Sequence, residues 1–210
     1  MKKCLFLIIL VFISFDIFAQ SNFKIRGLEW NVSLNNIVTN EGKPNDIKEY
    51  DIKGYPDGLY KKTEIIYYNK EVSSYKALLK YSLVLDKLIY AYYDFDDIYT
   101  YNVITIFNDL KNKLTELYGN YDLDKRNLWK SISKLYFLEN LTFMELSKLL
   151  DEGKQIYDKY IWNYNGTIIE LNVISSLNKT WSITITYKAP NYDEIIDDAL
   201  KNNRNNKKGL

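Results

Sequence analysis

The chain has 210 residues, of which 28 are lysine or arginine and 27 are aspartate or glutamate, so its formal net charge is +1. This length allows one large domain or two small ones, and the balanced charge lacks the basic excess that nucleic-acid-binding proteins usually show. There is no histidine, and the single cysteine, Cys4, precedes the first apolar run, where it cannot serve as a lipid-attachment site. Ser-His-Asp triads, Cys-His nucleophiles and the usual zinc and haem sites are therefore excluded, and we predict no cofactor and no metal.

Residues 1–19 have the three parts of a secretory signal peptide. Lys2 and Lys3 precede an apolar run of about 12 residues, and the small residue Ala19 ends the segment. A retained N-terminal anchor is the alternative, but Asp16 interrupts the run well short of the roughly 20 residues that span a bilayer. We therefore expect cleavage after Ala19 and an exported protein, periplasmic or extracellular, with no stable membrane span.

The first elements of the remaining chain are a short helix and a strand. The helix is expected over Leu34–Asn40, with Ser33 as its N-cap, and the Gly-Lys-Pro sequence at 42–44 ends it. Residues 45–60 contain two glycines and a proline, which favour a loop or an irregular sheet edge. Thr63–Asn69 then has the composition of a strand.

A tyrosine-rich hairpin forms the centre of the chain. Tyr75–Leu85 and Leu88–Phe95 are rich in Leu, Ile, Val and Tyr, and Asp86-Lys87 stands between them as a two-residue turn. Neither face of the second strand is wholly polar, so we expect both faces of the sheet to be at least partly covered.

From Tyr101 the apolar spacing becomes helical. Asp97 or Thr100 is the expected N-cap, and Gly119 is placed just past the end of the helix. Five apolar residues share one stripe that should cover the sheet and form the core: Val103, Phe107, Leu110, Leu114 and Leu117.

The second half repeats this scheme of a helix followed by three strands. Residues 120–127 are expected to form a polar connector and residues 128–141 receive no secure assignment, but a capping box at Thr142 and Glu145 predicts a helix that ends at Gly153. The turn Asn165-Gly166 is a strong hairpin signal, and the strand that follows the hairpin alternates apolar and polar residues. The three expected strands are Ile156–Tyr164, Thr167–Ile174 and Trp181–Tyr187.

These elements predict an α+β fold of antiparallel meanders packed against helices. Residues 20–189 form the expected single domain, with halves at about 28–119 and 120–189 that can share one continuous sheet. The halves have no clear residue identity, so duplication is only a hypothesis. Residues 190–210 are expected to form a short helix to Leu200 and then a disordered, Asn- and Lys-rich tail.

The helix at the start of the first half carries a resemblance to known exported proteins. It resembles the opening segment of the β-lactamase-inhibitor-protein-like class and of the related outer-membrane-assembly lipoproteins, in which a similar helix precedes three strands. The matching positions are Trp30, Ser33, Gly42 and Pro44. Tyr101–Gly119 is similar to a recurring element of other exported proteins, so the resemblance covers roughly residues 28–119.

The chain departs from both groups in its cysteines. The inhibitor members carry a cysteine pair in each half and the lipoproteins a lipid-attachment cysteine, and this sequence has neither. The resemblance implies a protein-binding or envelope-assembly role and brings no catalytic residues with it.

Two groups of carboxylates could carry chemistry. Asp94, Asp96 and Asp97 could bind a hard cation or act in acid–base catalysis, but acids at a strand end and helix start are also stabilised by the helix dipole alone. Glu170 lies in an apolar strand, where burial would raise its pKa, or on the alternating face that points to solvent.

Aromatic residues on the expected strands are the candidate binding surface. An exposed aromatic face could bind a partner protein or stack on sugars, and the alternative is that tyrosine fills the core of a chain with 20 tyrosines. The candidate residues are Tyr67, Tyr90, Tyr92, Trp162, Tyr164 and Trp181. The leading hypothesis is a non-enzymatic, envelope-associated protein-binding module, the second is a glycan or small-ligand binding module, and the third is a carboxylate-based hydrolase.

Overall fold

A computed structural model describes residues 23–54, 58–123, 138, 141–154, 156–175 and 181–208. The expected signal peptide at residues 1–19 lies outside these residues, as do residues 124–127 of the expected connector and most of the unassigned segment 128–141. No helix within the described ranges is long and apolar enough to cross a membrane.

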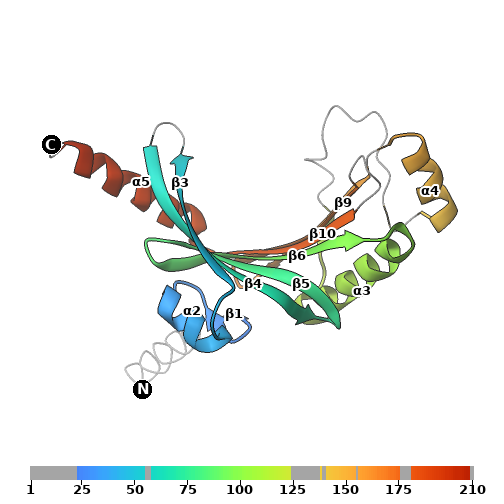
Figure 1. Cartoon of the computed structure of the whole chain (residues 1–210), viewed down its shortest axis with the longest axis horizontal. Helices are drawn as coiled ribbons and strands as arrows, with labels where there is room; N and C mark the ends of the chain where they lie inside the picture. Colours follow the sequence, from blue (N-terminus) through green and yellow to red (C-terminus); the bar gives the residue numbers. More distant parts are fainter. Residues whose placement is uncertain are drawn as a thin grey trace, which may run out of the picture.

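One antiparallel sheet of eight strands runs through both halves of the chain (Figure 1). In spatial order the strands are β3 (Asp46–Gly54), β4 (Gly58–Val72), β5 (Tyr75–Val84), β6 (Lys87–Ile98), β10 (Trp181–Lys188), β9 (Thr167–Ser175), β8 (Tyr157–Tyr164) and β7 (Asp122–Leu123). The halves meet where β6 pairs with β10. The predicted α+β class and the continuous sheet are therefore confirmed.

The first half contains one strand more than the sequence predicted. Residues 45–60 were expected to form a loop, but Asp46–Gly54 is a regular strand that pairs with β4 without a bulge, from Asp46 opposite Ile66 to Gly54 opposite Gly58. The glycines that suggested a loop are the last residue of one strand and the first of the next. They mark the end of a hairpin, and the residues of β3 that precede Gly54 were too polar to identify an edge strand.

The turn between β5 and β6 also differs by one residue from the prediction. It is formed by Leu85 and Asp86, with φ values of 53° and 54°, and Lys87 already belongs to β6. Two positive φ angles are typical of the type I′ turn that matches strand twist. The turn Asn165-Gly166 is confirmed, with φ values of 50° and 76°.

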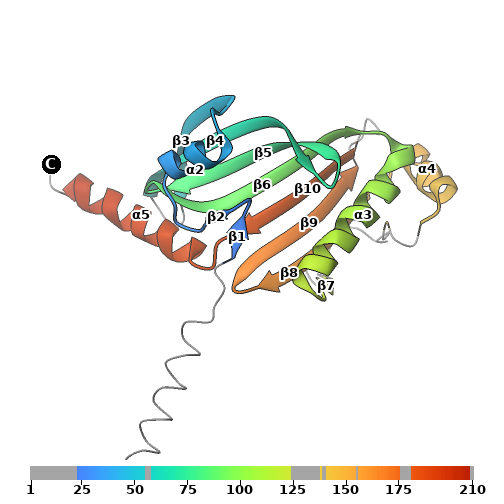
Figure 2. The same cartoon turned by 90° about the horizontal axis from the view of Figure 1, so that it is seen from below.

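Three helices and a small hairpin lie on one side of the sheet, which we call the covered face. Figure 2 shows the hairpin of β1 (Lys24–Ile25) and β2 (Leu28–Glu29) between helices α2 (Leu34–Glu41) and α3 (Thr100–Tyr118). Helix α4 (Phe143–Asp151) begins with the predicted capping box at Thr142 and buries its leucines in the same core. Ser33 caps α2 as predicted.

The apolar stripe of α3 is confirmed at four of its five positions. Val103, Phe107, Leu110 and Leu114 are buried, whereas Leu117 is 66% exposed. Leu117 lies in the last turn, where Tyr118 packs instead against the aromatic rings on the covered face. The N-cap prediction was also wrong, because Tyr99 occupies that position without a capping side chain and Thr100 is the first helical residue.

Helix α5 (Tyr192–Lys208) lies on the other side of the sheet, the open face, and projects past the sheet edge (Figure 2). The predicted disorder after Leu200 is wrong as far as Lys208, because the helix continues beyond its apolar residues. The amide of Asn203 donates a hydrogen bond to the carbonyl of Leu59 and holds this continuation against β4.

A single hydrophobic core joins the two halves on the covered face. Helix α3, from the first half, packs over β8, β9 and β10, and helix α5, from the second half, packs over β4, β5 and β6. The indole nitrogen of Trp30 donates to the hydroxyl of Thr167, 2.8 Å away and 137 residues later in the chain. Each half therefore supplies a helix that covers strands of the other.

Candidate functional site

The open face of the sheet carries polar side chains that the described helices cover only in part. Successive residues of a strand point to opposite faces, and β8, β9 and β10 accordingly alternate buried and half-buried residues. Of the described helices, only α5 packs on this face, and its apolar contacts lie at one end of it: Val84, Ile89, Ala189, Ile195 and Ala199.

Two groups of hydrogen-bonded polar side chains lie side by side on the open face, one across β6 and β10 and the other across β10, β9 and β8. Both carboxylate oxygens of Asp94 on β6 accept a hydroxyl, from Tyr92 at 3.1 Å and from Ser182 on β10 at 3.2 Å. The hydroxyl of Tyr157 on β8 donates to the side-chain oxygen of Asn172 on β9 at 3.2 Å. The Asn172 amide in turn contacts the hydroxyl of Thr184 at 3.5 Å. These bonds restrain the side chains that they join.

Most charges on the open face are paired within it. Lys48 lies 3.3 Å from Asp46, and Lys159 lies 2.9 Å from Glu170. Lys62 pairs with Glu64 and also lies over the ring of Tyr50, 5.8 Å from its centroid. Lys80 lies 5.5 Å from the centroid of the Tyr92 ring and has no ion pair within the described residues. Glu170 thus points to this face, where it pairs with a lysine.

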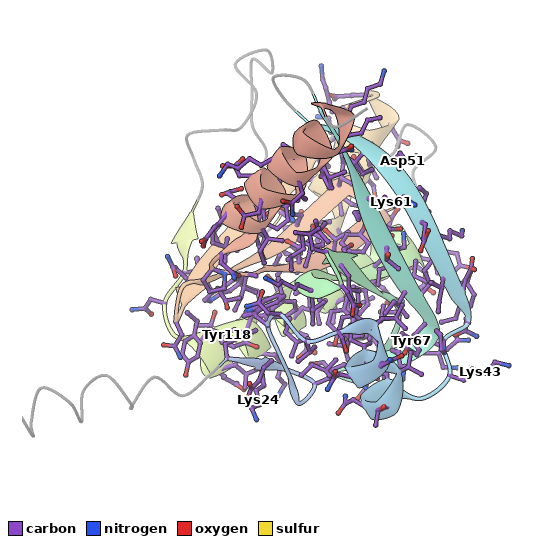
Figure 3. The ribbon with its side chains drawn as sticks, turned by 90° about the vertical axis from the view of Figure 1, so that its left-hand side faces the viewer. Lys24, Lys43, Asp51, Lys61, Tyr67 and Tyr118 are labelled. Carbon is purple, nitrogen blue, oxygen red and sulfur yellow. The ribbon has the colours of Figure 1, made fainter. Side chains whose placement is uncertain are left out.

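The structure places only two of the six predicted surface aromatics on this face, Tyr90 and Tyr92. Tyr67, Trp162 and Trp181 are 2%, 0% and 1% exposed and belong to the core, so they cannot form a binding surface. In Figure 3 Tyr67 lies beside helix α2. Tyr164 is half-buried in the same core.

The burial of the two tryptophans has a polar reason as well as an apolar one. Trp162 donates its indole N–H to the carbonyl of Gly119 and Trp181 donates to the hydroxyl of Thr100, so both ends of α3 are attached to the sheet. Alternation along a strand divides its residues into two sets that point to opposite faces, but it does not reveal which set faces the helices. The sequence alone therefore placed both tryptophans in a possible surface.

Tyr50 and Tyr157 belong to the open face and were missed as site residues. Tyr157 and Trp162 are an odd number of residues apart in β8, so their side chains point to opposite faces of the sheet. The sequence therefore identifies Tyr157 as an open-face residue once Trp162 is known to be on the covered face. Tyr50 is in β3, which the sequence assigned to a loop, and it is 38% exposed. Asp51 and Lys61 face each other across the same strand pair at the outer edge of the sheet (Figure 3).

A second polar centre lies on the covered face, around Glu41 at the end of α2. Its carboxylate accepts hydrogen bonds from Arg26 at 2.7 Å, Lys70 at 2.9 Å and the Tyr81 hydroxyl at 2.8 Å. Burial alone would raise the pKa of Glu41, but the hydrogen bonds from these three donors outweigh burial and lower it. An ionised carboxylate with saturated oxygens has little basicity, so this centre binds α2 to the sheet and is a poor general base.

Burial also raises the pKa of Tyr93, next to Arg26, to about 12. Because Tyr93 keeps its proton at neutral pH, it adds no charge to the Glu41 centre.

Two surface grooves lie near these elements. One, of about 560 Å³, runs between α2 and the β1–β2 hairpin and has both polar and apolar residues in its lining, and the other, of about 370 Å³, lies between α5 and β4. Each has a single carboxylate in its lining, Glu29 and Asp86 respectively. A pair of facing carboxylates, which glycoside hydrolysis requires, is therefore not built from the residues that line either groove.

The acidic cluster predicted from the sequence is described only in part. Asp94 uses both oxygens for hydroxyl groups, and the side chains of Asp96 and Asp97 lie outside the described residues. In the part of the chain that the structure covers, no group of three His, Cys, Asp or Glu side chains is placed to hold a metal ion.

No protein-family model, curated protein or solved structure matches this chain. The resemblance to β-lactamase-inhibitor-protein-like and outer-membrane-assembly proteins therefore stays a prediction.

Proposed function

We propose that this chain is an exported, non-catalytic protein whose open sheet face binds another protein of the cell envelope. The observation that carries the proposal is the pair of neighbouring hydrogen-bonded groups, one across β6 and β10 and one across β10, β9 and β8, on a face where α5 is the only described helix. A rigid surface loses little conformational entropy when a partner docks on it, and this favours binding.

The size of the open face fits a protein partner. The six strands from β4 to β8 span about 25 Å at the usual strand spacing, and eight residues extend about 26 Å. The resulting area of roughly 650 Å² includes the end that α5 covers, so the uncovered part is smaller than the roughly 800 Å² that each partner contributes to a standard interface and suits a small or transient one. Tyrosine, which is enriched in such interfaces, is present on this face at positions 50, 92 and 157.

A glycan partner is the second candidate, because sugars stack on aromatic rings next to hydrogen-bonding groups. Tyr92 and Asp94 offer that combination, but the ammonium of Lys80 lies over the Tyr92 ring. A sugar would have to displace this cation before stacking, which favours the protein partner.

Site-specific photocrosslinking in the native envelope tests the binding face. A photoreactive amino acid at Thr184, in the centre of the open face, should trap one partner, whereas the same group at the exposed Glu116 of α3 should not. With the purified pair, Thr184→Arg should weaken binding at least tenfold and Glu116→Arg should leave it unchanged. Crosslinking from Glu116 alone, or equal binding of both variants, would overturn the proposal.

Export is tested separately by the mass of the mature protein. If residues 1–19 are a signal peptide, the protein recovered from outside the cytoplasm begins at Gln20. A mature form that still begins at Met1 and stays in the cytoplasm would contradict this part of the proposal.

A further inference from the structure

The open face has one central cation that the rest of the face does not neutralise. Lys48, Lys62 and Lys159 each pair with a carboxylate on the same face. Lys80 has no such pair among the described residues; Asp94, which is near it in the sheet register, accepts hydroxyl groups from Tyr92 and Ser182. Its charge is therefore available to a partner.

The surroundings of Lys80 make it a favourable place for a carboxylate to bind. It lies in the middle of β5, opposite Ile66 on one side and Tyr92 on the other. Ile66 is only 4% exposed, and the Lys80 ammonium lies against the Tyr92 ring. An ion pair formed here beside apolar surface, and shielded from water by a docked partner, is stronger than one at the rim of an interface.

We propose that the partner presents an aspartate or glutamate side chain to Lys80, next to an apolar or aromatic residue that packs beside the Lys80–Tyr92 contact and leaves it in place. This inference rests on the proposed function and adds the chemistry of the partner to it. Because Lys48, Lys62 and Lys159 are already ion-paired, Lys80 gives the centre of the face a local preference for an acidic segment, and the ion pair fixes the position at which that segment docks.

A displayed peptide library provides the probe, since peptides of known sequence can be selected on the purified exported protein. Selected peptides should share an acidic residue beside an aromatic or apolar one. Lys80→Gln should weaken their binding at least tenfold, and Lys80→Arg should keep most of it. The matched control is Lys159→Gln, a lysine on the same face with its own carboxylate, which should change binding by less than twofold.

A double-mutant cycle then separates the ion pair from general loss of surface. Replacing the peptide's acid by its amide should weaken binding to the wild-type protein and have no further effect on Lys80→Gln. Peptides without an acidic preference, or peptides that bind Lys80→Gln as tightly as the wild type, would overturn the inference. If Thr184→Arg still abolishes their binding, the proposed function survives this result. If Thr184→Arg has no effect either, both proposals fail.

Discussion

Glu41 shows how one residue attaches a short helix to the sheet. Helix α2 has eight residues and could not persist alone in water, and the buried carboxylate at its end accepts hydrogen bonds from Arg26, Lys70 and Tyr81. Ile37, on the inner side of the helix, is fully buried beneath it. The helix is thus held by an apolar contact in its middle and an ionic contact at its end.

Replacing Glu41 by glutamine should lower the free energy of unfolding by about 2 kcal/mol near neutral pH, because two partly buried cations lose their counter-ion. The pKa of Glu41 is lowered in the folded protein, so its contribution is present above the unfolded pKa of about 4.3 and is lost as the pH falls through the folded pKa. Denaturant titrations of both proteins should therefore differ at pH 7 and converge in acid.

The control for Glu41 is Glu29→Gln. Glu29 pairs with one lysine, Lys24, at 3.2 Å, but its side chain is 45% exposed. Loss of this ion pair should therefore lower the free energy of unfolding by less than about 0.5 kcal/mol. Equal effects of the two substitutions would show that the Glu41 centre is no stronger than a surface ion pair.

Leu85 is a residue whose backbone conformation does not suit its side chain. Its φ is 53° and it is 47% exposed, so it has the strain of a left-handed conformation and little burial in return. Leu85→Asn should raise the free energy of unfolding by about 0.5–1 kcal/mol, since asparagine tolerates this region. Leu117→Asn, an exposed leucine within helix α3, should instead be neutral or slightly destabilising. A drop in thermal stability for Leu85→Asn would contradict the interpretation.

At the scale of elements, periodicity predicted which residues of α3 face the sheet but not where the stripe ends. Leu110 is 1% exposed and Leu117 is 66% exposed, although both have the same helical spacing. Leu110→Ala should cost about 3 kcal/mol, as expected for a buried leucine, and Leu117→Ala should have no measurable cost because alanine is a good helix former. Thermal unfolding of the two variants checks this, and equal losses would mean that α3 is not anchored by this stripe.

The sequence was informative where side-chain pattern and turn residues agree. The caps at Ser33 and Thr142 and the turn at Asn165-Gly166 follow from local chemistry, and the structure has all three. The candidate surface was less predictable. Alternation assigns the residues of a strand to two faces, and which of the two faces is exposed depends on where α2, α3 and α4 pack. Trp162 and Trp181 were for this reason assigned to a possible surface although they form the core.

At the scale of the whole molecule, the helices are exchanged between the halves. The meanders β4–β5–β6 and β8–β9–β10 meet antiparallel at β6 and β10, and the helices before them, α2 and α4, pack in the same covered-face core. The helices after them differ, because α3 covers the second meander on the covered face and α5 covers the first on the open face. The halves therefore resemble each other in order of elements but not in how they are covered.

This exchange predicts that neither half folds alone. In an isolated fragment 23–120, the stripe of α3 would lose β8, β9 and β10, and burial of its four side chains contributes about 8 kcal/mol. That is comparable with the whole stability of a typical domain, so the fragment should show no cooperative unfolding by circular dichroism. Fragment 121–208 should behave likewise, since its strands lack α3.

Mixing the two fragments should restore the fold, because the exchanged helices give each fragment the surface that the other needs. The control is the full-length protein cut after Asn120, whose pieces should stay together and unfold in one transition. Cooperative unfolding of either fragment by itself would mean that the halves are separate domains. In that case α3 would have to pack against apolar residues of its own half, and the core that the two halves share across β6 and β10 would contribute little to stability.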